Sequence, residues 1–465
     1  MLAEIQRTLS RQSAAIQREE DGASIAQNTV VGAPESQIPS SNKEKGEPSE
    51  HERDPEEASQ KQNPFDDVPD GGFVAWLQVS GSFFMYFNSW GLTNSFGAFE
   101  NFYTVNGLSH KTASDIAWIG SFQAFLVVLI GVVTGPVFDR GYCRTLVVVG
   151  SLMVVFGLMM TSLCTEYWQV MLSQAVVCGL GEGCLFIPGI AIIPQYFSSK
   201  RAFATGVAAA GSSMGGIIYP IVFHKLEPRL GFSWATRIIA FIVLGTQAYA
   251  LAVMRIRSMP KFKRSLYDPT AIGDFKFMVF TIVVFFAFAG AYVPFYYIQS
   301  FAVTRNIFDQ YTAFYMLSIL NAASVFGRIL PNFLADKIGP INVMFPFTIF
   351  TMIMAFVWAA INNAGGCIAF AILYGFFSGA FVSLPPPVLT TLCPDLRMIG
   401  TRMGMSFAIS GLGLLIGTPI AGALLQTPAQ YTATASFCGG CVAVASVLIV
   451  IVRVAKSGGR IVIKV

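Results

Sequence analysis

The sequence predicts an all-α membrane protein whose twelve transmembrane helices form two pseudo-symmetric halves of six helices each. Of its 465 residues, 54% are hydrophobic and 12% are charged, whereas an average soluble domain carries about 25% charged residues. From Phe73 onward, apolar runs of about 20 residues recur, which is the length needed to cross a bilayer core. Two similar charged turns, at 135–144 and 332–339, each follow an apolar run. Such an internal repeat indicates a duplicated half.

Residues 1–69 differ in composition from the rest of the chain. They hold 7 Lys and Arg against 14 Asp and Glu, whereas residues 70–465 hold 23 and 12. The segment is rich in Ser, Glu, Gln and Lys, so we expect a disordered, acidic N-terminal tail. A weak amphipathic pattern at Leu2, Ile5 and Leu9 leaves a short surface helix as the alternative. We expect no cleaved signal peptide, because no basic start is followed by an apolar segment.

Twelve apolar segments are long enough to span the bilayer. Their expected ranges are 73–99, 115–138, 144–164, 168–195, 202–224, 234–254, 272–297, 309–335, 340–360, 366–392, 399–424 and 432–453. The first six form an N-terminal half at 70–254, and the last six form a C-terminal half at 272–454. The basic linker at 255–271 joins them. We expect it to fix the topology, with contact to anionic lipid as the alternative.

The distribution of basic residues orients the predicted spans. With the N-terminus inside, the interior segments carry seventeen Lys and Arg and the exterior segments carry five. Because Lys and Arg accumulate in cytoplasmic loops, both termini are expected in the cytoplasm, including a short basic tail at 455–465. The same orientation places both charged turns on the cytoplasmic face.

The two charged turns resemble those of the major facilitator superfamily, in which an Asp at a helix end pairs with basic residues until transport breaks the contact. This resemblance implies the major facilitator fold, substrate binding near the bilayer midplane and alternating access. It also implies a conformational-switch motif, formed here by Asp139, Arg140, Arg144, Asp336 and Lys337.

Three further stretches resemble the monocarboxylate porter family in its fungal branch. They are Asp70-Gly71-Gly72-Phe73-Val74-Ala75-Trp76, the stretch from Tyr196 to Gly206 with small residues continuing to Gly216, and Arg328 after Ser318-Ile319-Leu320. Lactate-transporting members of that family carry Asp where this chain has Ser324 and Lys where it has Asn94. The resemblance therefore favours export of a specialised metabolite over lactate–proton symport.

Two ionisable side chains, Arg328 and Glu182, lie deep in predicted spans, where a charge costs about 2.5–3.5 kcal/mol and usually has a function. Arg328 suits an anionic substrate, because a guanidinium binds a carboxylate through two hydrogen bonds. A structural ion pair with Glu182 is the alternative. Glu182 suits a coupling proton, because burial favours the neutral form of a carboxyl group. A glutamate held by hydrogen bonds between glycine-faced helices is the alternative.

Polar and aromatic side chains at helical spacing outline a substrate-binding wall. The predicted binding residues are Arg328, Asn94, Asn321, Ser324, Tyr292, Tyr296 and Tyr374. Among them, Asn321, Ser324 and Arg328 share one helix face at i, i+3 and i+7. For each residue taken alone, helix–helix packing is the alternative.

Neither a cofactor nor enzymatic chemistry is expected. The CxxC pair Cys438 and Cys441 lies in an apolar segment without a nearby His or carboxylate, so we expect packing rather than a metal or redox site. We find no GxxxxGK[ST] phosphate loop and no nucleophile–base pair. The expected partners are the lipid bilayer and a small organic substrate, which Arg328 favours as an anion. A proton as coupling ion stays open, and no nucleic acid is expected.

We therefore predict a secondary transporter of the plasma membrane that exports an organic anion or a specialised metabolite by alternating access. Proton-coupled uptake of a monocarboxylate or a vitamin stays open, as does location in the vacuolar membrane. A transport-inactive membrane sensor that signals through its tail is the alternative from a different class.

Overall fold

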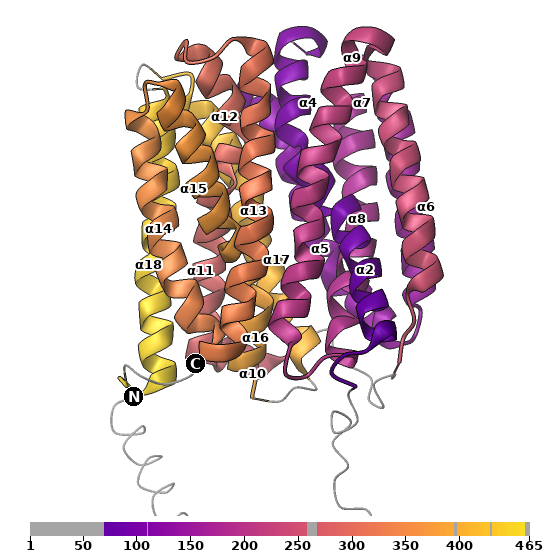
Figure 1. The fold of residues 1–465 in the computed structure, drawn as a ribbon, viewed down its shortest axis with the longest axis vertical. Coiled ribbons are helices and arrows are strands. Elements are labelled where there is room, and N and C mark those ends of the chain that lie inside the picture. The colour runs from indigo at the N-terminus through magenta and orange to yellow at the C-terminus, as the bar shows by residue number, and fades with distance from the viewer. Residues whose placement is uncertain (1–68, 109, 258–266, 395–397, 428–429, 461–465) are drawn as a thin grey trace, which may run out of the picture. The chain divides into compact units, whose positions relative to one another are not determined.

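The helices in this computed structural model stand side by side and run between two ends (Figure 1). The structure describes residues 69–108, 110–257, 267–394, 398–427 and 430–460. The predicted tail, apart from Pro69, and the middle of the predicted linker lie outside these ranges. We call the end where the first described helix begins and the last one finishes the termini end, and the other the opposite end.

The N-terminal half consists of the helices before the linker, coloured indigo to magenta in Figure 1. They are α2 (Phe73–Asn88), α3 (Trp90–Asn94), α4 (Phe96–Phe102), η2 (Tyr103–Gly107), α5 (Ala113–Asp139), α6 (Cys143–Thr161), α7 (Tyr167–Val170), η3 (Met171–Cys178), α8 (Gly179–Ala191), η4 (Ile193–Gln195) and α9 (Arg201–Val253). Inside α9 the chain turns at Gly231, whose φ of 75° is a conformation that glycine adopts without strain. This turn separates the fifth span from the sixth.

The C-terminal half follows the linker and is coloured orange to yellow. Its elements are α10 (Pro269–Gly273), α11 (Phe275–Ala291), α12 (Val293–Thr304), α13 (Gln310–Ile338), α14 (Pro340–Val357), η5 (Trp358–Ala360), α15 (Ala364–Ser383), α16 (Pro385–Leu392), α17 (Ile399–Leu424) and α18 (Gln430–Ser457). Proline begins α16 directly after α15 ends, and Pro294 lies in the first turn of α12 after α11. Because proline lacks an N–H, these positions interrupt the helical hydrogen bonds of two spans.

Ten helices in the described ranges are long and apolar enough to cross a membrane. That count treats α9 as one helix, although Gly231 divides it into two spans. It also omits the first span, because breaks at Ser89 and Ser95 divide this span into α2, α3 and α4. With these two additions, the predicted twelve-helix architecture is confirmed.

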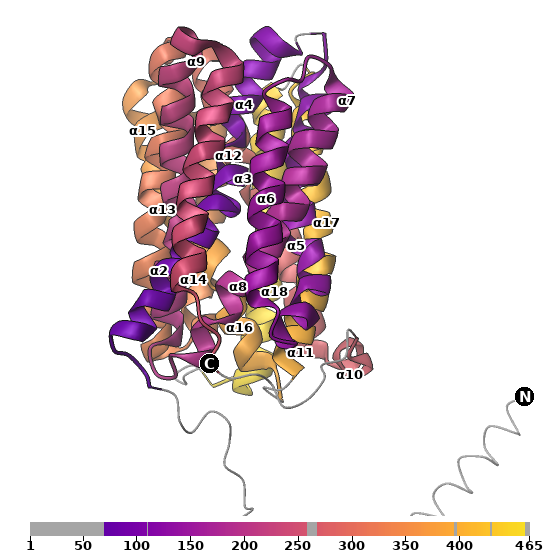
Figure 2. The same cartoon turned by 90° about the vertical axis from the view of Figure 1, so that its right-hand side faces the viewer.

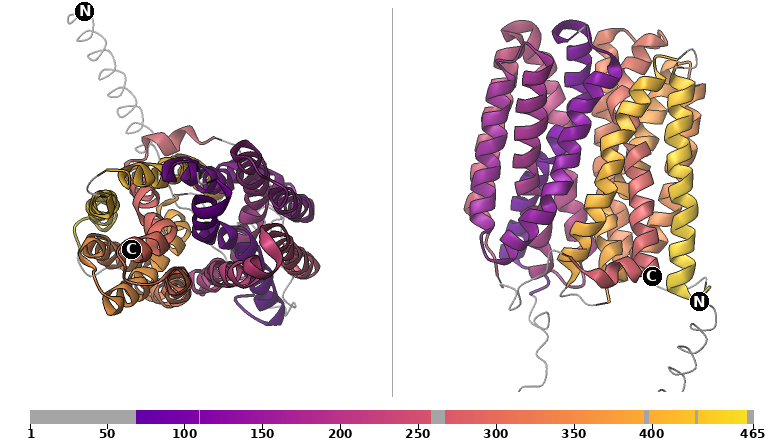
Figure 3. Two further views of the ribbon diagram at one scale, coloured as in Figure 1. Left: turned by 90° about the horizontal axis from the view of Figure 1, so that it is seen from above. Right: turned by 180° about the vertical axis from the view of Figure 1, so that it is seen from behind.

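The two halves meet chiefly along two helix pairs, α5 with α17 and α9 with α13, and α4 also contacts α12. Figure 3 shows the halves beside each other from above, and Figure 2 shows α10 beside α11 at the termini end. In the second pair, a Cβ atom on Gly206 would lie 2.5 Å from the carbonyl oxygen of Arg328. Only glycine allows this approach, so α13 is held directly against α9.

Candidate functional site

A small cavity of about 30 Å³ lies between the two halves. Four spans from each half contribute to its wall. The lining residues are Tyr86, Trp90, Val128, Phe186, Ala209, Phe288, Arg328, Val382, Ser383, Pro386 and Phe407. Of these described lining residues, Arg328 alone is charged. The cavity is therefore an apolar, aromatic chamber with one fixed positive charge.

Arg328 on α13 is 2% exposed and is held by neutral groups. Its Nε donates to Ser324 Oγ at 3.3 Å, and its Nη1 donates to the carbonyl oxygen of Ala209 at 3.3 Å and to Ser212 Oγ. Within the described ranges, Nη2 donates to no residue, and no carboxylate forms an ion pair with this guanidinium. A buried guanidinium without a countercharge is costly, so its charge is available to an anion in the cavity.

Five aromatic rings form a large part of the wall. The Trp90 ring lies 5.8 Å from Phe186 and 6.4 Å from Phe288, and Phe186 lies 5.9 Å from both Tyr86 and Phe407, as centroid separations. Sequence reasoning did not select any of these five residues. The spacing of Tyr86 and Trp90 by four residues was a usable signal, but the chain contains 41 Phe, most of which serve packing.

Two of the other predicted binding residues lie directly behind the cavity wall. Ser324 accepts the hydrogen bond from Arg328 and also receives one from Ser213 at 3.2 Å. Tyr292 stacks on Trp90 with a centroid separation of 5.8 Å and an interplanar angle of 29°. Both residues therefore position groups of the wall without lining it.

The remaining four predicted binding residues make packing contacts away from the lining. The Asn94 amide donates to the Ser212 carbonyl, and the Asn321 amide donates to the Leu317 carbonyl. The Tyr374 hydroxyl donates to the Ala291 carbonyl. The Tyr296 ring packs on Phe96. Asn94 and Tyr374 thus join different helices, whereas the hydrogen bond of Asn321 stays within α13. These contacts favour the packing alternative for the four.

Glu182 on α8 is fully buried and is held by two hydrogen bonds. Gln123 on α5 donates to Oε1 at 2.6 Å, and Thr93 on α3 donates to Oε2 at 3.2 Å. The carboxyl group therefore joins three spans of the N-terminal half and does not pair with Arg328. Phe186, one turn further along α8, lines the cavity, so Glu182 lies directly behind its wall.

A second buried carboxyl group was missed by the sequence prediction. The expected first span ended at residue 99, which left Glu100 outside the membrane. In the structure, α4 continues to Phe102 and Glu100 is 4% exposed. Both predicted residues, Arg328 and Glu182, are buried, but the expectation that only these two lie deep was wrong. A difference of one turn at a helix end decides which side chains are buried.

At the termini end, Asp336 connects the two halves. Its carboxylate, near the end of α13, accepts hydrogen bonds from the backbone N–H groups of Ala202 at 3.0 Å and Phe203 at 2.8 Å. These two N–H groups belong to the first turn of α9, which has no partner for them inside the helix. The negative charge also lies at the positive end of the α9 helix dipole.

The remaining residues of the predicted switch motif lie nearer the surface. Arg140 and Arg144 are exposed at the termini end. The Lys337 ammonium lies 4.3 Å from the centroid of the Phe333 ring. The side chain of Asp139, at the end of α5, lies outside the described part of the structure. The inter-half contact is therefore described for the second charged turn.

At the opposite end, the same helix pairs close the cavity. Lys225 Nζ on α9 donates to the Tyr311 hydroxyl on α13 at 2.8 Å, and the His224 ring stacks on Phe314 with centroids 4.0 Å apart. Ser114 on α5 donates to the carbonyl oxygen of Pro419 on α17 at 3.0 Å. Because the halves touch at both ends, the structure shows the cavity in an occluded arrangement.

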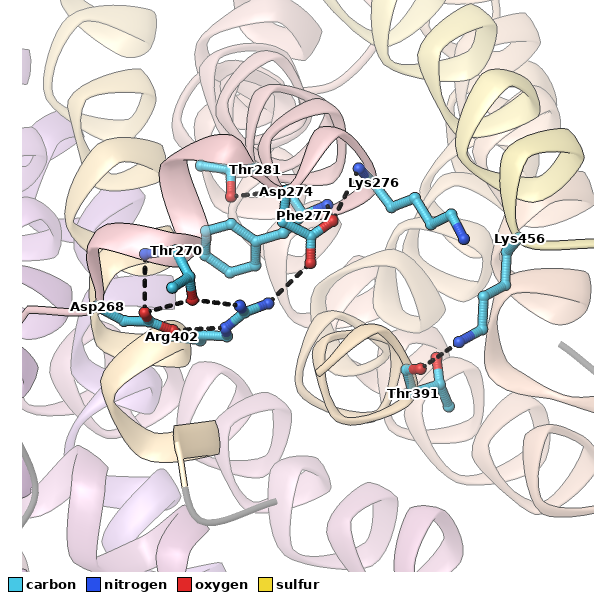
Figure 4. A network of polar contacts seen from close by, with 9 residues as sticks. All are labelled: Asp268, Thr270, Asp274, Lys276, Phe277, Thr281, Thr391, Arg402 and Lys456. Carbon is cyan, nitrogen blue, oxygen red and sulfur yellow. Dashed lines mark hydrogen bonds and ion pairs between the residues drawn. The ribbon is translucent and has the colours of Figure 1, made fainter. Parts of the chain in front are cut away.

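Figure 4 shows a further charged network, at the termini end of the C-terminal half. Arg402 on α17 donates to Asp268 at 2.9 Å, to Asp274 at 2.8 Å and to Thr270 at 3.2 Å. The Thr270 hydroxyl, together with Arg402, holds the pKa of Asp268 below its usual value. The network ties the end of the linker and α10 to α17. In the sequence analysis, Arg402 was only one of the basic residues counted on the predicted interior segments. Its partners could not be predicted, because they lie more than 100 residues away in the chain.

Two stretches that resemble monocarboxylate porters contact each other at the termini end. Asp70 accepts hydrogen bonds from the N–H groups of Ser198 and Ser199, both at 2.9 Å, and the Ser199 hydroxyl keeps the pKa of Asp70 below its ordinary value. The Trp76 ring packs on Phe197 at 5.2 Å and on Phe203 at 6.0 Å. Both stretches therefore join the first span to the fifth, far from the cavity lining.

An enclosed cavity with one cation, placed between two pseudo-symmetric helical halves, defines the class of secondary membrane transporters. A sequence profile of the Major Facilitator Superfamily matches residues 72–365, and the chain belongs to this family. It is 47% identical to the MFS-type transporter dbaD of Emericella nidulans, over 77% of this chain and 80% of the relative.

Two further relatives carry names that state export. The chain is 39% identical to the aspyridones efflux protein apdF of Emericella nidulans, over 77% of this chain and 73% of the relative. It is 36% identical to the agnestins efflux protein AgnL12 of Paecilomyces divaricatus, over 83% of this chain and 89% of the relative. A solved structure of the nucleoside transporter NupG aligns with a TM-score of 0.63 at 14% identity, over 82% of this chain and 100% of NupG. At that identity, the likeness concerns the fold alone.

Proposed function

We propose that this chain exports an aromatic organic anion, a specialised metabolite of a fungal cell, by alternating access. The observation that supports this most strongly is Arg328, a buried guanidinium facing an aromatic cavity without a carboxylate partner among the described residues. A carboxylate or an acidic phenol on the substrate would supply the missing negative charge through charge-assisted hydrogen bonds.

The wall around Arg328 favours an aromatic skeleton. Ring pairs in offset or edge-to-face geometry contribute about 0.5–1.5 kcal/mol each beyond their buried area. Trp90, Phe186 and Phe407 are positioned to make such contacts with a flat ligand. In this occluded arrangement the cavity volume is only about 30 Å³, far below the roughly 300–1,000 Å³ that is usual for small-molecule sites, so binding the substrate requires the halves to move apart.

Export as the direction of transport is supported by relatives. Two similar fungal proteins are named for the efflux of aspyridones and agnestins. We infer the same direction for this chain, with a substrate of its own. The excess of basic residues on the predicted interior segments supports a cytoplasmic termini end, and we propose the plasma membrane as the location. Opening at that end would load the cavity, and opening at the opposite end would release the anion.

The conformational change would use the Asp336 contact as one of its two-state elements. Closing the termini end forms the bonds to Ala202 and Phe203, and opening it breaks them. Each contact of this kind is worth about 0.3–1 kcal/mol when exposed, which is weak enough to form and break in every cycle. Glu182 is the proposed carrier of a coupling proton.

Uptake of a monocarboxylate remains the alternative direction and substrate. The motifs that resemble monocarboxylate porters are engaged in packing between the first and fifth spans, so they support a shared architecture more than a shared substrate. Location in the vacuolar membrane stays open, and so does the role of a transport-inactive sensor.

The test is an untargeted comparison of metabolites in cells and medium for the native host with and without this chain. Export predicts an aromatic acid that builds up inside the deleted cells and falls in the medium. A supplied acid that stays in the medium of the deleted strain would show uptake instead. Unchanged metabolites in both compartments, together with a changed transcriptional response, would point to a sensor.

A further inference from the structure

We propose that the break in the tenth span is a second anchor for the exported anion, where backbone carbonyl groups accept a hydrogen bond from a hydroxyl or N–H group of the substrate. This inference rests on the proposed function, in which Arg328 binds the acidic group of the substrate in the same cavity. It narrows the substrate class to aromatic acids that also carry a hydrogen-bond donor.

Three consecutive prolines begin α16 and leave three carbonyl groups at the end of α15 without a helical donor. In an α-helix, each carbonyl oxygen accepts a hydrogen bond from the N–H group four residues later, and proline has no N–H. The prolines at 385–387 therefore leave the carbonyl oxygens of residues 381–383 without their usual partners. The flanking N–H groups are used elsewhere, since Leu384 donates to the Ala380 oxygen and Val388 donates to the Leu384 oxygen, both at 3.0 Å.

This break offers acceptors without the donors that usually accompany them. The first turn of a helix normally exposes N–H groups, but the first three residues of α16 are the prolines. Within the described ranges, the hydroxyl groups nearest in sequence also donate to other oxygens, Ser383 to Ala380 at 3.2 Å and Thr390 to Pro386 at 2.9 Å. Because buried backbone carbonyl groups nearly always have a partner, three such oxygens in succession indicate a place where a donor from outside the chain binds.

The Val382 carbonyl belongs to the face of the span that lines the cavity. Val382, Ser383 and Pro386 all line this cavity together with Arg328. Leu384, between the two helices, keeps helical backbone angles with φ −84° and ψ −21°, so Val382 and Pro386 share one face at i and i+4. A proline ring lies against the carbonyl group four residues earlier. The Val382 oxygen is therefore adjacent to the Pro386 ring at the cavity wall.

The break is held at a fixed place beside the helix that carries Arg328. The Asn332 amide on α13 donates to the Arg328 carbonyl oxygen and to Ser383 Oγ, both at 2.7 Å. One turn earlier in α15, a Cβ atom on Gly379 would lie 2.8 Å from the carbonyl oxygen of Ser324, so the two helices pack closely there. Both anchors belong to the C-terminal half, so they keep their separation while the halves move, and the same two groups hold the substrate throughout the cycle.

The charge of Arg328 determines which ligand suits the carbonyl oxygens. Unpaired carbonyl groups at helix breaks in transporters also bind cations, but a cation in this small cavity would be repelled by the buried guanidinium, and such repulsion is strong where water is excluded. A neutral hydroxyl or N–H group meets no repulsion. Between transport cycles a water molecule can serve as the donor, because the cavity volume of about 30 Å³ exceeds the roughly 10–15 Å³ that one water needs.

Equilibrium dialysis with the purified full-length protein in detergent tests this requirement. The probes are the isomeric hydroxynaphthoic acids and their methyl ethers, and mass spectrometry measures each compound separately. We expect at least one hydroxy acid to bind about fivefold more tightly than its ether, because the ether has no proton to donate. Pro386→Ala restores an N–H group that pairs with the Val382 oxygen, so this ratio should fall to about one. Pro346→Ala makes the same exchange inside α14, which contributes no residue to the described lining, and should keep the ratio.

Equal binding of every hydroxy acid and its ether by the wild type would overturn the second anchor, whether or not Pro386→Ala folds. A preference for the hydroxy acid that persists in Pro386→Ala would overturn it as well. Binding that rises with Na⁺ in the wild type but not in Pro386→Ala would assign the carbonyl groups to a cation and would also contradict the inference.

Arg328→Gln separates this inference from the proposed function. If this variant loses the binding of acids and ethers alike while the wild type shows no preference for the hydroxyl group, anion binding at Arg328 stands and only the second anchor fails. Binding of none of the acids by the wild type would contradict both proposals.

Discussion

Replacing Asp336 by Asn should loosen the contact that closes the termini end. The carboxylate holds two N–H groups of the first turn of α9, at 3.0 and 2.8 Å, across the boundary between the halves. A neutral amide keeps one acceptor oxygen and loses the charge at the helix N-terminus. The interaction of a carboxylate charge with a helix N-terminus is worth about 1 kcal/mol in a partly exposed position. Its loss changes the equilibrium between the closed and open arrangements roughly fivefold.

Hydrogen–deuterium exchange of the full-length protein measures this change directly. In Asp336→Asn, a peptide covering residues 201–206 should exchange about fivefold faster, since its first amides lose their acceptor and the closed state is less populated. Asp309→Asn removes an exposed carboxylate before α13 at the opposite end and is the matched control. Wild-type exchange of 201–206 in Asp336→Asn would refute the reasoning that this carboxylate closes the termini end.

Two further predictions concern the packing that supports the site. Arg402→Gln should destabilise the protein by about 3 kcal/mol, because breaking a buried ion pair leaves the partner carboxylates Asp268 and Asp274 uncompensated. The pKa of Asp268 lies below its usual 3.8 in the folded protein. The network therefore contributes its full stabilisation of the fold above about pH 4, and this stabilisation is lost as the pH falls through the lowered pKa. The difference in melting temperature between the variant and the wild type should therefore shrink below about pH 4, and a constant difference at all pH values would contradict this assignment. Gly206→Ala should lower the free energy of unfolding by about 1–3 kcal/mol through overpacking and should slow transport, because the alanine Cβ would lie 2.5 Å from the Arg328 carbonyl oxygen. If transport and melting temperature equal those of the wild type, α13 moves aside freely and the prediction is wrong.

The twelve spans could be predicted because their signals are local. An apolar run long enough to cross a bilayer is visible without knowing its neighbours, and the turn at Gly231 lies in the polar gap between two such runs. The cavity position of Arg328 followed from the cost of a charge inside a span. Each of these inferences used one short segment of sequence.

The partners of these residues could not be predicted, because they come from distant segments. Asp336 binds the start of α9, 134 residues earlier in the chain, and Arg402 binds Asp268, 134 residues earlier. The burial of Glu100 depended on one additional helical turn at the end of the first span. Aromatic wall residues such as Phe186 cannot be distinguished in the sequence from the other Phe residues of membrane helices, because only the packing shows which of them line the cavity.

The central claim is that Arg328 binds the exported anion in the aromatic cavity. The most direct measurement is the amount of the accumulating metabolite in cells of the deleted host that express wild-type protein, Arg328→Gln or Arg305→Gln, at matched levels in the membrane. Arg305 is an exposed arginine at the opposite end, so its variant controls for loss of a positive charge. We predict that wild type and Arg305→Gln restore export and that Arg328→Gln leaves the metabolite inside. Full export by Arg328→Gln would contradict the claim.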